Sequence, residues 1–245
     1  MVSDTPEGCC SPPEVVQAAR ASIIAVIRDV SRIPAMVVAD YRLGLVYPSE
    51  SRFTILFVCT GNQCRSALAE VITRSLTEGL PVEVSSAGTD VLGSVPSPKK
   101  TLKAASKLGY DLGEHRSRPL ADADLDSAGL VVGFEVPHVA TAVIERGADR
   151  SRTWLLPQLV RALEGGPAGS QRGSGDLIAG ARSRLSRAAE RRSSAPPMMG
   201  DQIADPIGRS ARTHESTART IDDLCRRMVA GLFRATGAVD EQPRR

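Results

Sequence analysis

This chain of 245 residues has few aromatic residues and no strong excess of positive or negative charge. Phe, Trp and Tyr make up 3% of the sequence, and 31 basic against 28 acidic side chains leave a net charge of only +3. So small an excess does not indicate a nucleic-acid-binding surface. No segment approaches the roughly 18 consecutive apolar residues of a membrane span. The sequence therefore predicts no nucleic-acid partner and no membrane span.

Cysteine is also infrequent, and its count of five is odd. An odd number does not suit the paired disulfide framework of a small secreted protein. The start of the chain is acidic and lacks the basic segment of a secretory signal peptide. We therefore expect a cytoplasmic location, where thiols stay reduced.

Residues 58–66 form the segment with the most chemical content. They read Val-Cys-Thr-Gly-Asn-Gln-Cys-Arg-Ser and stand between an apolar run at 53–58 and a helix-forming run at 67–75. A loop that joins a strand end to a helix N-terminus presents free backbone N–H groups and the positive end of the helix dipole. The sequence therefore predicts an anion-binding loop at this position.

Two side chains in this loop indicate a reaction at the bound anion. Cys59 begins the loop, and a cysteine that faces such N–H groups is expected to exist as a thiolate. Arg65, after five intervening residues, can clamp two phosphate oxygens with its planar guanidinium. The pair predicts a thiolate nucleophile beneath a bound phosphoryl group. The alternative is a buried cysteine before an ordinary helix-starting turn, which the strand, the Gly-Asn turn and the helix together disfavour.

The other loop residues are expected to shape the phosphate site. Ser66 can donate a hydrogen bond to the Cys59 sulfur, and Asn62 tolerates a left-handed backbone conformation. Cys64 is either a redox partner, which forms a reversible disulfide with Cys59, or a small side chain that packs in the loop. The phosphate-binding set is Thr60, Gly61, Asn62, Gln63, Cys64, Arg65 and Ser66.

Apolar strand-like runs alternate with amphipathic helix-like runs after residue 50. The strands are expected at 53–58, 82–86, 129–134 and 152–156, and the helices at 65–78, 97–108, 136–146, about 157–164 and 212–235. This alternation predicts an α/β fold, a three-layer sandwich around a central, mostly four-stranded parallel sheet. The phosphate-binding loop follows the first strand. Ligands of such sheets bind at the carboxyl ends of strands, where Cys59 is placed.

The chain divides into three parts. An N-terminal helical extension is expected at 1–50, a catalytic domain at 51–236 and a C-terminal tail at 237–245. The extension contains an amphipathic pattern at 13–31, which favours a helix packed on the domain. Membrane association and binding of a partner helix are the alternatives.

The catalytic domain contains a basic, Gly/Ser/Pro-rich insertion at 165–201. Its two ends have the composition of linkers, and residues 176–192 between them can form a basic helix. We expect a surface excursion. A lid or a docking arm for an acidic or phosphorylated partner is the alternative, because the insertion leads directly into the segment around Asp205.

Residues 57–70, Phe-Val-Cys-Thr-Gly-Asn-Gln-Cys-Arg-Ser-Ala-Leu-Ala-Glu, resemble the signature of the low-molecular-weight protein-tyrosine phosphatase family, which also contains arsenate reductases. The resemblance covers about residues 51–236. It implies a cysteine-dependent phosphatase that needs no cofactor and no metal. Further matches in the family's order are Ser85–Thr89, Gly113–Arg118, Leu130–Phe134 and Ile203–Gly208.

The resemblance also implies roles for residues outside the loop. Asp205 is the expected general acid, which protonates the leaving oxygen and then activates water, and Pro206 restricts the backbone that aims it. The catalytic set is thus Cys59, Arg65 and Asp205. His115 is expected to hydrogen-bond Asn62 or Ser66, with a lone surface histidine as the alternative. Two further histidines have no partner at ligand spacing and are expected at the surface, namely His138 and His214.

The expected activity is hydrolysis of phosphotyrosine-type phosphomonoesters of protein through a thiophosphate on Cys59. The expected partners are a phosphorylated protein, which the resemblance implies can be a tyrosine kinase of polysaccharide export, and phosphate or other oxyanions. Four departures from the family concern the substrate. No aromatic residue occurs at 90–98, and Ile207 follows the Asp-Pro pair. Gln63 stands where an aliphatic residue is common, and Ala67 replaces the usual proline after Arg-Ser.

Two other functions remain as alternatives. An arsenate reductase coupled to a small thiol needs only the loop cysteine, whereas the thioredoxin-coupled kind needs further cysteines, and residues 129–150 contain none. A pseudo-phosphatase would bind phosphoproteins through the loop without turnover. Asp205, a leaving-group acid that arsenate reduction needs less, favours a phosphatase over the reductase. The complete set of Cys59, Arg65, Ser66 and Asp205 argues against a pseudo-phosphatase.

Overall fold

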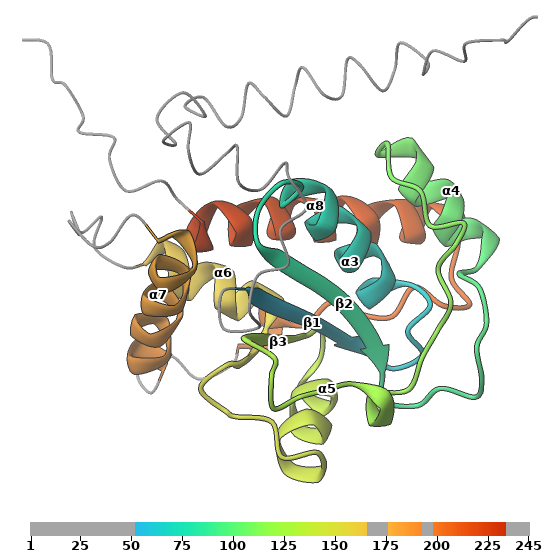
Figure 1. Ribbon diagram of the computed structural model, residues 1–245. Coiled ribbons are helices and arrows are strands. Elements are labelled where there is room, and N and C mark those ends of the chain that lie inside the picture. The colour runs from blue at the N-terminus through green and yellow to red at the C-terminus, as the bar shows by residue number, and fades with distance from the viewer. Residues whose placement is uncertain (1–51, 166–175, 193–197, 234–245) are drawn as a thin grey trace, which may run out of the picture.

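A sheet of four parallel strands forms the centre of the protein, as seen in a computed structural model that describes residues 52–165, 176–192 and 198–233 (Figure 1). The strands are β1 (Phe53–Cys59), β2 (Val82–Gly88), β3 (Leu130–Gly133) and β4 (Thr153–Leu155). Their order in the sheet is β2-β1-β3-β4, and every pairing is parallel. The expected parallel sheet is therefore confirmed, with β1 between two partners.

Strand β1 is apolar throughout because both of its faces are buried. Side chains alternate across a strand, and Phe57 enters one hydrophobic cluster while Leu56 and Val58 enter another on the opposite face. Strands covered on both sides carry continuous apolar runs rather than alternating ones. This placement explains why the run at 53–58 contains so few polar residues.

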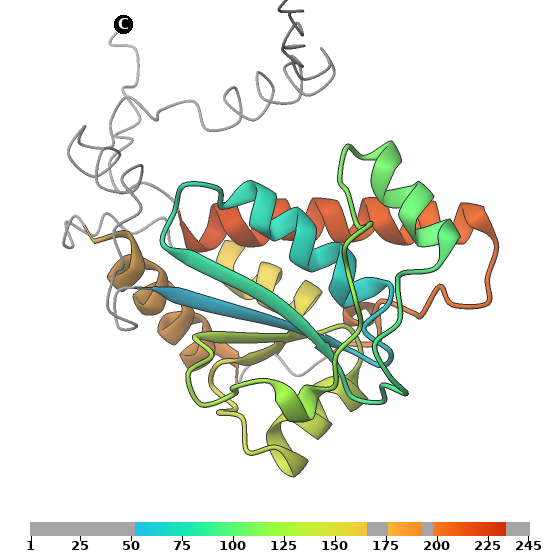
Figure 2. The ribbon, with the colours of Figure 1, turned by 45° about the vertical axis from the view of Figure 1, so that its right-hand side comes forward.

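Helices cover both faces of the sheet and complete the expected three layers (Figures 1 and 2). The larger cluster joins the sheet to the long helices, and the smaller one joins it to short helical turns. The first face carries α3 (Arg65–Leu76), α6 (Leu156–Glu164) and α8 (Ala211–Leu232), with α4 (Lys99–Lys107) against α8, and the second carries η3 (Leu120–Asp122), α5 (Val136–Ala140) and η4 (Thr141–Glu145).

The strands and most helices begin and end within three residues of their expected positions. The helix expected at 136–146 is different, because it ends as α5 and continues as the π-helical turn η4. In that wider turn the Arg146 N–H donates to the Thr141 carbonyl, and the Ala148 N–H donates to the Ala142 carbonyl. Ala142 is thereby turned into the smaller hydrophobic cluster.

The insertion contains helix α7 (Leu177–Arg192), which packs on the domain and is not a surface excursion. Its buried side chains follow helical spacing and join the larger cluster. They are Ile178, Ala181, Leu185 and Ala188. The helix lies at the end of the sheet where β1 begins (Figure 1), since Arg182 donates to the Arg52 carbonyl. The anion-binding loop follows the other end of β1, so α7 is not placed to act as its lid.

The arginines of α7 serve as internal donors. Arg184 donates to the carbonyl of Leu232, the last residue of α8, and Arg191 donates to the carbonyl of Ala162 near the end of α6. Carbonyl groups at helix C-termini lack partners within their own helix, and positive charge there is favourable. Arg192 lies over the ring of Trp154, 3.2 Å from its centroid. The basic composition of the insertion is thus explained in part by contacts within the domain.

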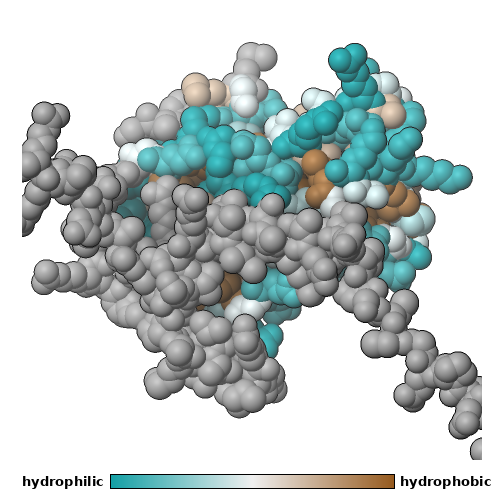
Figure 3. All heavy atoms as spheres, turned by 90° about the horizontal axis from the view of Figure 1, so that it is seen from above, coloured by the Kyte–Doolittle hydropathy of each residue, from teal (hydrophilic) through white to brown (hydrophobic). Residues whose placement is uncertain are grey.

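Several expectations lie outside the described residues. These are the helical extension at 1–50, the tail at 237–245 and the linker-like parts of the insertion at 166–175 and 193–197. Among the described helices, none has both the length and the apolar character needed to cross a membrane. On the face shown in Figure 3, the described surface is mainly hydrophilic, with small apolar patches.

Candidate active site

The anion-binding loop is fixed at the carboxyl end of β1 by the segment that follows β2. The Thr89 N–H donates to the Cys59 carbonyl, and the Asp90 N–H donates to the Thr60 carbonyl, both at 2.9 Å. The approach is close at Gly88, where a Cβ atom would lie 2.5 Å from the Thr60 carbonyl oxygen. Only glycine fits there without a shift of the loop.

The loop presents free backbone donors. Within the described part of the chain, no hydrogen bond uses the N–H groups of residues 61–64. Helix α3 begins directly after them at Arg65, so the positive end of its dipole lies at the loop. Unpaired N–H groups that converge at a helix N-terminus are suited to hold phosphate oxygens.

Cys59 is buried and lies next to a hydroxyl group. Its Sγ atom is 3.0 Å from Ser66 Oγ, and 2% of the residue is exposed. Ser66 in turn accepts a hydrogen bond from Asn62 Nδ2 at 2.9 Å. With Asn62 donating to its oxygen, the hydroxyl proton of Ser66 is free to point at the sulfur.

Asn62 holds the loop in its bent shape. Its φ of 49° is the left-handed conformation expected from the sequence, and it is the only positive φ of a non-glycine residue in the described part of the chain. The side chain also donates to Ser86 Oγ at 2.7 Å and accepts from the Arg118 N–H at 2.9 Å. These bonds tie the loop to β2 and to the segment after residue 113.

Arg65 is fully buried and contacts two carboxylates. Nη2 donates to Asp205 Oδ2 at 2.7 Å, and Nη1 donates to Glu135 Oε2 and to the Ile203 carbonyl. Its Nε is buried without any hydrogen-bond partner. A buried donor without a partner is costly, and this one belongs to the residue expected to hold phosphate. The free Nε therefore fits an oxyanion bound in the loop.

Glu135 and His138 were missed by the sequence reasoning. Glu135 follows β3 at the same edge of the sheet as the loop and contacts Arg65. His138 was expected at the surface, and this was wrong, since 2% of it is exposed. Its Nδ1 accepts from the Glu135 N–H at 3.0 Å, so the proton lies on Nε2, which contacts Thr60 Oγ1 at 3.0 Å.

The environment of His138 keeps its ring neutral. Burial and the nearby charge of Arg65 lower the pKa of His138 to about 4. A neutral ring can accept with one nitrogen and donate with the other, as the contacts here require. The signal that could have found Glu135 is its place directly after a strand, where ligands of parallel sheets bind.

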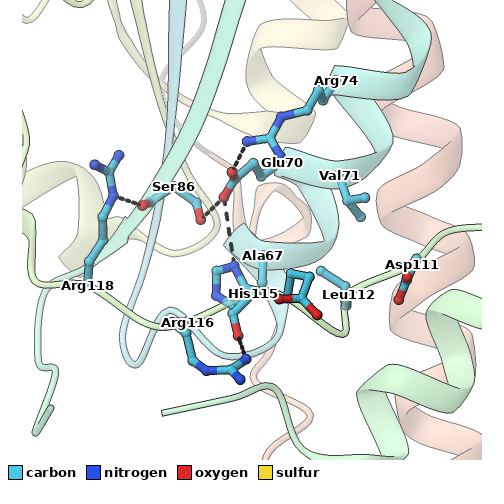
Figure 4. A pocket seen from close by; sticks show the side chains of 11 residues that line it. Ala67, Glu70, Val71, Arg74, Ser86, Asp111, Leu112, His115, Arg116 and Arg118 are labelled. Carbon is cyan, nitrogen blue, oxygen red and sulfur yellow. Dashed lines mark hydrogen bonds and ion pairs between the residues drawn. The ribbon is translucent and has the colours of Figure 1, made fainter. Parts of the chain in front are cut away.

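His115 lies behind the loop rather than alone at the surface. Its Nε2 is 2.7 Å from the Asn62 carbonyl oxygen, and its Nδ1 is 3.9 Å from Glu70 Oε2. Glu70 accepts from Ser86 Oγ at 2.5 Å and also contacts Arg74. Figure 4 shows these side chains around a pocket of about 300 Å³ between α3, β2 and the segment at 111–118. None of the loop residues 59–66 lines this pocket, and His115 connects it to the loop through the Asn62 carbonyl.

Cys64 is buried in the last part of the loop. Its Sγ is 3.0 Å from Thr101 Oγ1 on α4, and both cysteines of the loop are free thiols. Burial raises the pKa of Cys64 to about 12, although the hydrogen bond with Thr101 opposes this. Cys64 is therefore a thiol at neutral pH.

Asp205 is brought to the loop by the segment between the insertion and α8. The Ile203 N–H donates to the Phe134 carbonyl at 2.8 Å, which attaches this segment to the end of β3. The Asp205 side chain remains 34% exposed and also accepts from the Ile207 N–H. The structure thus places the carboxylate beside Arg65, with one edge open to solvent.

His214 was the second histidine expected at the surface, and this was also wrong. It lies in the first turn of α8 and is 3% exposed. Its Nδ1 is 3.0 Å from Thr101 Oγ1. Among the described residues, no group of three or more His, Cys, Asp or Glu side chains is arranged to hold a metal ion.

The sequence is similar to those of known phosphatases. The family described as "Low molecular weight phosphotyrosine protein phosphatase" matches residues 54–166, a range that ends before Asp205. A protein-arginine-phosphatase of Bacillus subtilis is 36% identical over 115 residues, which cover 45% of this chain and 75% of that protein. The low molecular weight protein-tyrosine-phosphatase Etp of Escherichia coli K12 is 32% identical over 111 residues, covering 45% and 74%.

Solved structures show the same fold. A YwlE mutant from Bacillus subtilis is 25% identical, with a TM-score of 0.52, over 74% of this chain and 98% of that chain. A low molecular weight protein tyrosine phosphatase from T. tengcongensis matches with a TM-score of 0.54 at 23% identity, over 74% and 99%. Because the family model matches residues 54–166 and 74% of Etp is covered at 32% identity, this chain belongs to the low molecular weight protein-tyrosine-phosphatase family and is a cysteine-dependent phosphatase.

Proposed function

We propose that this protein hydrolyses phosphotyrosine-type phosphomonoesters of proteins through a thiophosphate on Cys59. The observation that carries the proposal is the arrangement around Cys59, with Ser66 Oγ at 3.0 Å and the unpaired, buried Nε of Arg65 at the same loop. The loop supplies a nucleophile and donors for the phosphate oxygens, while Asp205 supplies a carboxyl group.

In the first step the Cys59 thiolate attacks phosphorus, and the bond between phosphorus and the leaving oxygen breaks. The N–H groups of residues 61–64 and the Arg65 guanidinium stabilise the charge on the three other oxygens. The carboxyl group of Asp205 gives its proton to the leaving oxygen, so that a neutral alcohol or phenol departs.

In the second step water attacks the phosphorus of the thiophosphate. Asp205, now a carboxylate, takes a proton from this water, and the bond between sulfur and phosphorus breaks. Phosphate leaves and the thiolate of Cys59 returns. The hydroxyl of Ser66 stabilises the departing sulfur through the hydrogen bond at 3.0 Å.

The contact between Asp205 and Arg65 belongs to the enzyme before substrate binds. A phosphoryl group in the loop would compete with Asp205 for the Arg65 guanidinium, because both are oxyanions. Once displaced, the Asp205 carboxyl group is free to face the leaving oxygen. Glu135 and the Ile203 carbonyl still hold Nη1 and keep the guanidinium oriented.

The role of Asp205 predicts a selective effect of Asp205→Asn. The variant should lower kcat/KM by about a hundredfold for phosphotyrosine but by less than about tenfold for para-nitrophenyl phosphate, because only a poor leaving group needs the proton. Initial rates over a series of aryl phosphates measure this. The control is Asp223→Asn, on the exposed side of α8. Asp201→Asn is less suitable, because it would break the ion pair of Asp201 with Arg161. Equal losses across the series would contradict the assignment.

The segments that follow the strand ends bear on the choice of substrate. Aliphatic side chains are exposed in the segments that follow β2, β3 and the Asp-Pro pair, namely Leu92, Val136 and Ile207. None of them can stack on a phenyl ring. Aliphatic side chains in these segments would also suit the methylene stem of phosphoarginine, the substrate that the name of the Bacillus subtilis relative indicates. Phosphoarginine is therefore a second candidate.

A direct comparison decides between the two substrates. We expect a higher kcat/KM for a phosphotyrosine peptide than for the same peptide with phosphoarginine, because the matching family is described by phosphotyrosine, while the Asp205 proton can assist either leaving group. Release of phosphate from both peptides gives the answer. A preference for the phosphoarginine peptide would replace phosphotyrosine in the proposal and leave the thiophosphate step unchanged.

Other expectations remain predictions. They are a protein tyrosine kinase of polysaccharide export as the substrate, a cytoplasmic location, and a reversible disulfide between Cys59 and Cys64. Arsenate reduction with a small thiol remains the alternative reaction. The name of the Escherichia coli relative states a protein-tyrosine-phosphatase and mentions no kinase.

A further inference from the structure

The side chain of Thr60, the residue directly after Cys59, lies between a histidine and the arginine of the loop. Thr60 Oγ1 is 3.0 Å from His138 Nε2 and 3.4 Å from Arg65 Nη2. The same Arg65 nitrogen donates to Asp205 Oδ2 at 2.7 Å. The Thr60 hydroxyl is therefore close to the groups expected to act on the phosphoryl group. The proposed reaction does not use this hydroxyl.

The tautomer of His138 fixes the direction of its contact with Thr60. Backbone N–H groups can only donate, and those of Glu135 and Phe134 approach His138 Nδ1 at 3.0 and 3.3 Å. Nδ1 is therefore an acceptor, and the ring proton lies on Nε2. The ring is 2% exposed and has no access to solvent as an alternative partner. Nε2 thus donates to Thr60 Oγ1.

The remaining contact of Thr60 also comes from a donor. A guanidinium group has no acceptor, so Arg65 Nη2 donates to Thr60 Oγ1. A hydroxyl group has two lone pairs and one proton, and these two donors occupy the lone pairs. Across residues 52–165, 176–192 and 198–233, no hydrogen bond gives the Thr60 proton an acceptor. Because Thr60 is only half-buried, this proton is open to a bound molecule.

The neighbouring groups indicate what that molecule is. The buried Nε of Arg65 has no partner, and within the described chain the N–H groups of residues 61–64 are also unpaired. All of these groups are donors, and so is the Thr60 hydroxyl. A phosphoryl group has three strongly accepting oxygens and can take hydrogen bonds from several donors at once. An oxyanion is therefore the ligand that satisfies the whole set.

We propose that the Thr60 hydroxyl, oriented by His138, donates a hydrogen bond to an oxygen of the transferring phosphoryl group. Thr60 is thus a further catalytic residue, and His138 is a positioning residue that acts through it. This inference rests on the proposed reaction at Cys59. The charge on the phosphoryl oxygens is present with every substrate. The contribution of Thr60 is therefore independent of the leaving group, unlike that of Asp205.

The test of Thr60 separates its hydroxyl from its volume. Thr60→Val keeps the volume and removes the hydroxyl, while Thr60→Ser keeps the hydroxyl. We expect Thr60→Val to lower kcat/KM about tenfold or more for both phenyl phosphate and para-nitrophenyl phosphate, and Thr60→Ser to stay within about threefold. The control is Thr220→Val, on the exposed side of α8, where the hydroxyl donates only to the Ser216 carbonyl. It should leave kcat/KM unchanged.

The test of His138 uses a conservative variant and a double variant. His138→Gln can still accept from the backbone N–H groups and donate to Thr60, whereas His138→Phe can do neither. His138→Phe should lower kcat/KM for both substrates, and His138→Gln should recover most of the loss. If His138 acts through Thr60, adding His138→Phe to Thr60→Val should cost little further kcat/KM. A full additional loss in the double variant would contradict this coupling. If His138→Phe fails to fold, His138→Gln and the Thr60 variants carry the test.

A titration with inorganic phosphate keeps this inference distinct from the proposed reaction. In the Cys59→Ser background, Thr60→Val should raise the Kd for phosphate about fivefold, as measured by isothermal titration. An unchanged Kd together with an unchanged kcat/KM in Thr60→Val, or an equal loss in Thr60→Ser, would overturn the donor role. So would a loss confined to phenyl phosphate, because it would assign Thr60 to the proton transfer. Undiminished turnover in Cys59→Ser would refute the proposed reaction, and the titration would still decide the role of Thr60.

Discussion

A Cys59→Ser variant should lose more than about a thousandfold in turnover of para-nitrophenyl phosphate. A serine hydroxyl stays protonated in this loop and is a far weaker nucleophile than a thiolate. In the proposed mechanism the N–H groups of residues 61–64 and Arg65 hold the phosphate oxygens, and the sulfur does not. Phosphate or vanadate should therefore still bind, which isothermal titration or protection against thermal unfolding can measure.

The matched control for this variant is Cys225→Ser. Cys225 is buried in α8 within the larger hydrophobic cluster and is likewise a free thiol. Its replacement tests whether any loss of a buried thiol reduces activity. We expect it to retain turnover, at some cost in stability because a hydroxyl is placed in the core. Undiminished turnover in Cys59→Ser would exclude the thiophosphate mechanism, and the pseudo-phosphatase alternative fails if the wild type turns over at all.

The second large effect is expected for Arg65→Lys. The change should lower kcat/KM by about a hundredfold or more, because a lysine ammonium is a point charge and cannot reproduce a planar fork. Arg65 also spans Glu135, the Ile203 carbonyl and Asp205 at once. A lysine would leave some of these acceptors without a donor, so thermal stability should fall as well. Steady-state kinetics and a thermal melt measure the two effects.

The control for Arg65→Lys is an exposed arginine that also pairs with a carboxylate. Arg219 lies on α8 and approaches Glu215 at 3.8 Å, with 64% of its side chain exposed. Arg219→Lys should leave both kinetics and melting nearly unchanged, since exposed ion pairs contribute little. A loss of less than about threefold in Arg65→Lys would mean that charge alone, and not the fork, holds the phosphoryl group.

The sequence by itself determined the loop. Cys59, Asn62, Arg65 and Ser66 lie within eight consecutive residues between a strand and a helix, so their relative positions follow from local backbone geometry. The left-handed φ of Asn62 and the contact between Cys59 and Ser66 are both of this local kind. Spacing along the chain is sufficient to predict such contacts because few conformations join a strand end to a helix over so short a distance.

The sequence also determined the class of fold. Alternating apolar and amphipathic runs predict a parallel sheet with helices on both faces, and the period of each run sets which element it forms. These runs do not predict that β1 lies between β2 and β3 in the sheet. Strand order depends on how helices pack across the sheet, and that packing joins residues far apart in sequence.

Only the tertiary structure decided the surroundings of Glu135, His138 and His214. Each was unremarkable in the sequence, and both histidines were expected at the surface. Strand order brings Glu135 and His138 to Arg65 and Thr60, across at least 70 residues of chain, and the packing of α4 on α8 buries His214 beside Thr101. A lone polar residue has no period or spacing to reveal its burial. Its surroundings, and therefore its charge and partners, exist only after distant segments have packed together.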